Sequence, residues 1–214
     1  MDYKTLNTKG ISYLDLVPGT DRWYWGMDYT QGDLYEAEEL FRDCHAVQSN
    51  RLILVSYPEG KVLEPVKAVP GQYFGNAVFW EGRIHFLLVD FNMEKILIYR
   101  CSEDCSTAEA EAELPLSTVK DCYNLMLEIE PLTLIRQGHE NTFQVVWPEW
   151  GDFRIDPTES LDSRDGDALV FSKWFEDPDY REETVIRRYP TGEITENIKA
   201  AFKRMPDGQK WLLK

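Results

Sequence analysis

The sequence of 214 residues contains no apolar run of about 18 residues, the length a helix needs to cross a bilayer. Its first ten residues carry scattered charges and lack the apolar stretch of a signal peptide. Four cysteines are too few and too irregularly spaced for the disulfide framework of a small secreted protein; they are Cys44, Cys101, Cys105 and Cys122. We therefore expect a cytoplasmic protein with reduced thiols and no membrane partner.

The loops that hold nucleotide phosphates are also missing. The sequence has neither the Gly-Lys-Ser/Thr step of a P-loop nor the three-glycine fingerprint of a dinucleotide site. It also lacks the Gly-x-Ser-x-Gly of a nucleophile elbow, which leaves only a dispersed triad open for hydrolase chemistry. These absences argue against ATP and NAD chemistry, and we expect no cofactor.

Metal ligands are scarce as well. Histidine occurs three times, at His45, His85 and His139. His85 lies in a predicted strand, where a hydrogen-bonded structural role is favoured over catalysis, and His139 lacks the second histidine of a zincin helix. Cys101 and Cys105 have no second pair at zinc-finger spacing, and residues 161–172 lack carboxylates at both ends of an EF-hand loop. The sequence predicts no metal site.

Acidic residues dominate the charge that is present. Against 23 lysines and arginines stand 38 aspartates and glutamates, for a net charge of −15. Such a field repels polyanions, which disfavours nucleic acid and anionic membranes as partners. Hydrophobic residues make up 43% of the chain, enough to build a core and to argue against disorder.

Short β-rich runs separated by turns fill the middle of the sequence. Residues 51–57 and 61–66 predict a hairpin, and four further runs predict an antiparallel meander: residues 77–80, 83–91, 95–101 and 108–116. Glu81 and Gly82 fit a two-residue hairpin turn, and we expect Val78, Phe86 and Leu88 in the core. Later runs pair less clearly: residues 124–129 with 132–135, 142–147 with 152–155, and 168–174 with 183–189.

Two segments have helical spacing instead. Asp33 and Glu36 form a candidate capping box, followed by apolar residues at helical intervals to Cys44, although residues 34–40 also alternate as a strand would. The second segment is residues 193–204, with acids near its start, bases near its end, and Pro206 and Gly208 after it.

A repeat is suggested by an offset of 62 residues that pairs Asp28 and Tyr29 with Asp90 and Phe91. Successive meanders with glycine turns and such an Asp-aromatic step resemble the blades of a β-propeller, over Tyr24 to Tyr189. The resemblance implies an all-β fold of four or five blades of about 45 residues, in a ring that can be incomplete. The Gly-His and Trp-Asp signatures of the best-known propeller repeats are absent, no particular family is indicated, and a β-sandwich is the alternative.

Acids beside aromatic rings give the only candidate ligand site. Residues 149–183 contain twelve acids and four bases, a net charge of −8, together with two tryptophans. Aromatic rings pack against the apolar face of a sugar while carboxylates accept its hydroxyl hydrogens, although such rings more often form core. The candidate ligand-binding residues are Trp25, Asp28, Asp90, Trp147, Glu149, Trp150, Trp174 and Asp177.

We therefore predict a single β-rich domain over residues 1–214, with a helical or extended segment at about 190–214. Its expected function is non-catalytic, the binding of a ligand or partner protein. The alternative is a carbohydrate-binding or glycoside-hydrolase-like propeller enzyme that uses dispersed carboxylates such as Asp28, Asp90, Glu149 and Asp177. A subunit of a larger assembly is a third reading, which an exposed apolar patch would favour.

Overall fold

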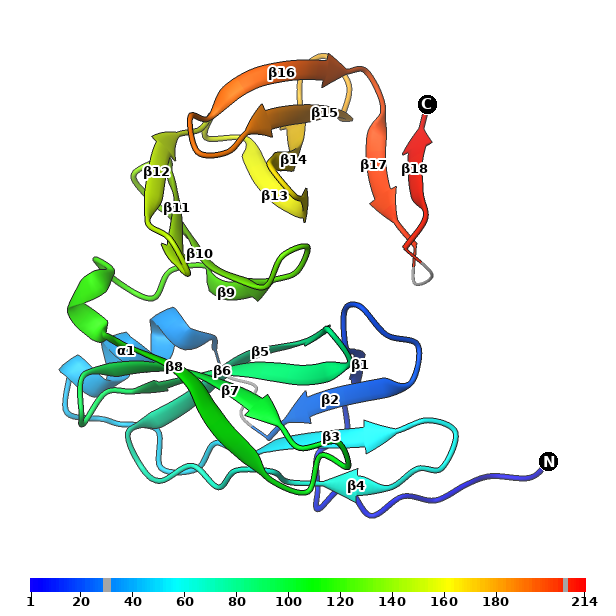
Figure 1. The fold of residues 1–214 in the computed structure, drawn as a ribbon, viewed down its shortest axis with the longest axis vertical. Coiled ribbons are helices and arrows are strands. Elements are labelled where there is room, and N and C mark those ends of the chain that lie inside the picture. The colour runs from blue at the N-terminus through cyan, green and yellow to red at the C-terminus, as the bar shows by residue number, and fades with distance from the viewer. Residues whose placement is uncertain (29–31, 206–207) are drawn as a thin grey trace. The chain divides into compact units, whose positions relative to one another are not determined.

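The computed structural model describes residues 1–28, 32–205 and 208–214 (Figure 1). The chain divides into two compact units, Met1–Cys122 and Tyr123–Lys214. Whether the chain folds as the single domain expected from the sequence stays a prediction.

The first unit contains two four-stranded antiparallel sheets. One sheet consists of β1 (Asp15–Leu16), β2 (Trp23–Met27), β3 (Leu52–Ser56) and β4 (Val62–Leu63). The other consists of β5 (Gln72–Trp80), β6 (Arg83–Asp90), β7 (Lys95–Cys101) and β8 (Ala108–Pro115). Helix α1 (Leu34–Arg42) lies between β2 and β3 in sequence, and a 3-10 turn, η1 (Leu116–Thr118), follows β8.

The second unit repeats this plan and adds a hairpin. Its first sheet consists of β9 (Leu125–Glu128), β10 (Thr133–Gly138), β11 (Thr142–Trp147) and β12 (Gly151–Arg154). Its second sheet consists of β13 (Glu159–Asp165), β14 (Ala168–Phe175), β15 (Arg181–Arg188) and β16 (Glu193–Ile198). Strands β17 (Ala201–Arg204) and β18 (Lys210–Leu213) form the two-stranded hairpin.

Strands in every four-stranded sheet follow one another in sequence order. This order is the meander of a propeller blade, and it differs from the Greek-key order of most β-sandwiches. The expected class is therefore confirmed: the fold is all-β, built from antiparallel meanders, and propeller-like with few blades. The fourth strand expected at residues 108–116 is present as β8.

The turn between β5 and β6 has the predicted form. Trp80 pairs with Arg83, so Glu81 and Gly82 are the two loop residues. Their φ angles are +46° and +78°, the left-handed values that a two-residue primed turn requires. The hairpin sets the register that places Phe86 opposite Ala77.

Helix α1 is confirmed, and the strand alternative for residues 34–40 is wrong. The side chain of Asp33 accepts hydrogen bonds from the backbone N–H groups of Tyr35 and Glu36, and Glu36 accepts one from the backbone of Asp33. Leu34 and Ala37 face the interior. The reciprocal bonds satisfy N–H groups that the first helical turn leaves without partners.

The helix expected at residues 193–204 is wrong, because this segment forms β16 and β17. Residues of β16 pair with β15, from Thr184 opposite Ile198 to Arg188 opposite Glu193. The hydroxyl of Thr184 also donates to the carbonyl of Ala200 at 2.7 Å. Pairing with an open strand edge outweighs the helical spacing of the apolar residues. The proline expected to end the helix, Pro206, lies outside the described residues.

Each unit has its own apolar core. In the first unit, the two sheets share a buried cluster that includes Leu54, Phe74 and Phe86. Phe86 has no exposed surface, and its ring centroid lies 5.7 Å from that of Phe74. Val78 and Leu88 are also buried, so the predicted core residues are confirmed. In the second unit, the corresponding cluster is built around Phe143 and Phe171 of the two sheets there.

Candidate functional site

Two of the predicted site residues in the first unit, Trp25 and Asp28, make contacts that stabilise the fold. Trp25 is half-buried and packs against the core cluster of that unit. Asp28 accepts hydrogen bonds at 2.7 Å from both the backbone N–H and the Nε of Arg51. Burial opposes the charge of Asp28, but the bonds from Arg51 prevail and lower its pKa. The carboxylate therefore stays ionised and joins the end of β2 to β3.

Asp90 has a similar position at the end of β6. Its Oδ2 accepts from Nε2 of Gln72 at 2.6 Å, and its Oδ1 accepts from the backbone N–H of Met93 at 2.9 Å. Asp28 directly follows the second strand of its sheet and Asp90 is the last residue of the second strand of the other sheet, as the proposed repeat suggests. Tyr29, the aromatic residue of the first copy, lies outside the described residues.

The other five predicted site residues lie in the second unit, at the ends of β11 and β14 or just after these strands. Trp147 ends β11 half-buried, and Glu149 and Trp150 follow it on the exposed connection to β12. Trp174 lies near the end of β14, and the exposed Asp177 follows that strand. Trp150 is 52% exposed and Trp174 is 37% exposed. Their rings are open to solvent, and ligand binding by this group stays a prediction.

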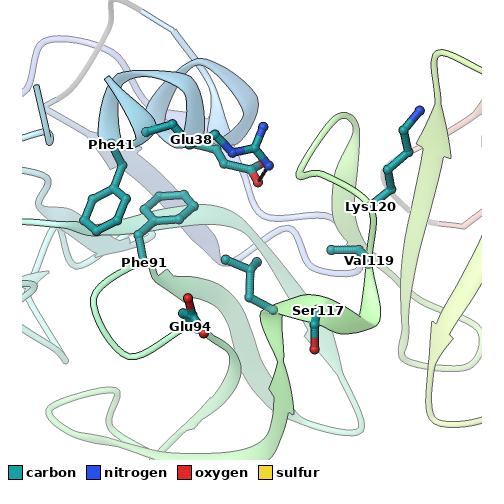
Figure 2. A pocket seen from close by; sticks show the side chains of 9 residues that line it. Glu38, Phe41, Phe91, Glu94, Ser117, Val119 and Lys120 are labelled. Carbon is teal, nitrogen blue, oxygen red and sulfur yellow. Dashed lines mark hydrogen bonds and ion pairs between the residues drawn. The ribbon is translucent and has the colours of Figure 1, made fainter. Parts of the chain in front are cut away.

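A pocket of about 310 Å³ opens beside α1 in the first unit (Figure 2). Its volume is near the lower end of the range found for small-molecule sites. The described residues that line it come from α1, the β6–β7 turn and the segment around η1: Glu38, Phe41, Arg42, Phe91, Glu94, Leu116, Ser117, Val119 and Lys120. None of them is among the residues predicted from the sequence.

Two phenylalanines form the apolar wall of the α1 pocket. Phe41 of α1 and Phe91 stack with ring centroids 5.5 Å apart and an angle of 29° between the rings. Figure 2 shows the two rings side by side below the helix. Phe91 is buried, whereas Phe41 is half-buried. The stack anchors the helix to the sheet and leaves an aromatic surface toward the pocket.

Glu38 fixes the polar side of the same pocket. It is only 4% exposed, and its Oε1 forms an ion pair with Arg42 one helical turn further on. Its Oε2 accepts a hydrogen bond at 2.7 Å from the backbone N–H of Cys122. A buried carboxylate with both oxygens bonded holds the guanidinium of Arg42 in place. Arg42 and Lys120 are both exposed and bring positive charge to the pocket.

Two carboxyl groups in the second unit have raised pKa values. Desolvation raises the pKa of Glu128, at the end of β9, to about 7, against the opposing effects of the Ile129 N–H and Arg204. Desolvation and the charge of Glu182 raise the pKa of Asp162, in β13, to about 6. Each remains in contact with solvent. Perturbed carboxyl groups of this kind are candidates for proton transfer or ligand binding.

No metal centre is formed by the part of the chain that the structure describes, where no three His, Cys, Asp or Glu side chains gather to hold an ion. All four cysteines are free, with Cys44 exposed and the other three buried. Within the described ranges, no helix is long and apolar enough to span a bilayer.

Comparison with protein-family models and with curated proteins gives no match. Among solved structures, a protein from Bacteroides uniformis, provisionally described as a 6-phosphogluconolactonase, aligns with 92% of this chain. The sequence identity is 10% and the TM-score is 0.43. The aligned region covers 62% of that protein's length, so the chain spans less than two thirds of it.

Proposed function

We propose that the protein is a non-catalytic binding domain, and that its ligand occupies the α1 pocket of the first unit. The observation that carries this proposal is the combination of a stacked aromatic wall, Phe41 and Phe91, with two exposed cations, Arg42 and Lys120. Ligand sites commonly join an apolar surface to a few fixed polar groups. The buried Glu38 supplies the fixed element by holding Arg42.

The chemistry of this pocket favours a small molecule with one apolar or planar part and one acidic group. The apolar part would lie against the two rings, and the acidic group would approach Arg42 and Lys120. Glu38 and Glu94 also line the pocket, which disfavours a highly charged anion such as a nucleoside triphosphate.

A thermal-shift screen tests this function, because a ligand that binds the native state raises the melting temperature. The screen includes aromatic and aliphatic carboxylates, nucleotides, mono- and oligosaccharides and divalent metals. We expect a small carboxylate to bind, and Phe41→Leu to weaken its binding about tenfold. Tyr13→Leu, at an exposed aromatic position that does not line the pocket, is the control and leaves the affinity unchanged. No binding by any carboxylate, or equal binding by Phe41→Leu, would contradict the proposal.

A second function, binding or hydrolysis of a carbohydrate by the second unit, is favoured by the raised pKa values of Glu128 and Asp162. A carboxyl group protonated near neutral pH can serve as the general acid of a glycosidase. The exposed rings of Trp150 and Trp174 offer sugar-stacking surfaces on the same unit.

A panel of aryl glycosides tests this second function. Hydrolysis that disappears in Glu128→Gln but persists in Glu196→Gln would support it. Glu196 is the matched control because it is an exposed carboxylate of the same unit and is not among the candidate site residues. Absence of hydrolysis, together with no shift in melting temperature by any oligosaccharide, would rule it out for the sugars used.

A further inference from the structure

We propose that the β17–β18 hairpin is a self-association element, which binds the acid-rich surface of a second copy of this chain. This surface is formed by exposed residues within 149–183. The inference is independent of the ligand pocket in the first unit.

Exposed apolar side chains on β18 are the first observation. Trp211 is 48% exposed, Leu212 is 45% exposed and Leu213 is 53% exposed. Among the described strands, β18 pairs only with β17, so its other edge carries free backbone donors and acceptors. An open strand edge with adjacent apolar side chains is a typical template for association.

Two ion pairs tie the hairpin to its own unit, and Ala201 and Phe202 of β17 are half-buried. Arg204 pairs with Glu130 at 2.5 Å, and Lys210 pairs with Asp165 at 2.5 Å. Ion pairs at a solvated surface contribute at most about 1 kcal/mol each. A two-stranded hairpin is only marginally stable alone. The ion pairs help to position the hairpin, while the apolar side chains of β18 remain exposed.

The charges of the hairpin segment and of the acid-rich surface are opposite in sign, which favours this surface as the partner. Residues 199–214 contain five basic residues and one acidic residue, a net charge of +4 in a chain whose net charge is −15. Arg204 and Lys210 pair within the unit, so the exposed bases that can face a partner are Lys199, Lys203 and Lys214. Residues 149–183 carry a net charge of −8 and expose three aromatic rings: Trp150, Trp174 and Tyr180. A basic apolar hairpin and an acidic aromatic surface are complementary in both respects.

Both surfaces belong to the second unit, so a two-fold dimer would form the same contact twice. An anionic membrane would offer the same charge complementarity to the hairpin. The net charge of −15 opposes approach to such a membrane and to a second copy alike, but a second copy also offers the exposed rings of its acidic surface to the apolar side chains of β18. The second copy is therefore the favoured partner.

Sedimentation of the full chain between about 1 and 200 μM, at 50 mM and 500 mM salt, tests the inference. We expect a dimer whose dissociation constant rises at least tenfold in high salt and at least tenfold in the Trp211→Ser/Leu213→Ser variant. Met93→Ser is the matched control, because Met93 is 62% exposed but belongs to the first unit. It leaves the dissociation constant unchanged.

Charge reversal provides the second readout. Lys203→Glu/Lys214→Glu and Glu176→Lys/Asp177→Lys should each be monomeric, and an equimolar mixture of the two variants should form a heterodimer. In the heterodimer, the acidic hairpin of the first variant meets the basic surface of the second variant. The native basic hairpin of the second variant meets the native acidic surface of the first. A monomer at every concentration, a dimer that these variants do not affect, or a mixture that stays monomeric overturns the proposal. Hairpin-dependent binding to phosphatidylserine vesicles without dimerisation overturns it in favour of a membrane.

Discussion

The two units use the same sheet plan but bury different chemistry. In the first unit, the shared cluster of the two sheets is apolar and dense in aromatic rings, including Phe74 and Phe86. The second unit has a comparable aromatic cluster but also buries three arginines: Arg136, Arg164 and Arg187. The same meander architecture therefore accepts either a mostly apolar interior or one that also contains paired charges.

Every buried arginine of the second unit has partners. The guanidinium of Arg187 donates from Nε to Oε2 of Glu159 at 3.0 Å and from Nη2 to Oε1 at 3.1 Å. Arg136, which has no exposed surface, donates from Nη1 to Glu140 at 2.7 Å and to Gln144 at 2.9 Å. Buried charges must be matched in this way, because each unpaired one carries a large desolvation cost. The stability of the second unit should thus fall most when a buried charge loses its partner, whereas the stability of the first unit should fall most when core packing is lost.

Phe86→Ala should have the largest effect, through the first unit. Removing a fully buried ring leaves a cavity beside Phe74 and Tyr99, which lowers the free energy of unfolding by about 3 to 5 kcal/mol. Urea denaturation followed by circular dichroism measures the loss, with the exposed Tyr13→Ala as control. An unchanged urea midpoint would show that this cluster is not the core of the unit.

Glu159→Gln tests the second unit in the same way. The substitution keeps the size of the side chain but leaves the buried charge of Arg187 without its anion, at a cost of about 3 kcal/mol. The double variant Glu159→Leu/Arg187→Met removes both charges and should recover most of this loss. A double variant as unstable as Glu159→Gln would mean that the pair is needed for more than mutual charge compensation.

Glu128→Gln should give a smaller effect that depends on pH. The pKa of Glu128 is raised from 4.5 to about 7, so the folded state holds the proton more tightly than the unfolded state. Stability therefore falls as pH rises from about 4.5 to about 7, and the variant lacks this loss. At pH 8 the variant should be more stable than the wild type, by on the order of 2 kcal/mol, and at pH 4 nearly equal. Thermal unfolding across this range measures the difference, and a difference independent of pH contradicts the assignment.

Gly82→Val should have the smallest effect. Nothing lies within 4 Å of the position a Cβ would take, so only the φ of +78° is unfavourable for valine. We expect a loss of about 1 kcal/mol, measured by urea denaturation. Gly82→Asn should cost less, since asparagine tolerates left-handed backbone angles. Equal losses for the two variants would indicate a cause other than backbone conformation.

The sequence was informative wherever the determining contacts are local. Hairpins such as the one at Glu81 and Gly82 are set by the turn residues and the alternation on either side. The capping box of α1 is likewise complete within four residues, Asp33 to Glu36. The helix predicted for residues 193–204 was wrong because their apolar spacing suits a helix, whereas pairing with the available edge of β15 makes the first part of the segment a strand.

Strand β13 and the α1 pocket could not be predicted from the sequence, for a different reason. In β13 the acids recur every third residue and do not follow strand alternation, and Arg164 is buried with a distant partner, the hydroxyl of Thr133, to which it donates at 2.8 Å. Such a strand lacks the apolar signal that pattern reading detects. The pocket combines three segments separated by more than 20 residues each, and no local motif marks the approach of Phe41 to Phe91. Only the folded chain brings these groups together.

The consecutive order of strands has a consequence for synthesis on the ribosome. Every strand of the sheet β5 to β8 finds its partners within residues 72–115, and those of β1 to β4 within residues 15–63. Neither sheet has to wait for residues beyond Cys122 to complete its pairing. Folding of early segments during translation is the usual course when contacts are local. Nascent chains of increasing length should therefore gain protease resistance in steps, each step following the emergence of a complete sheet.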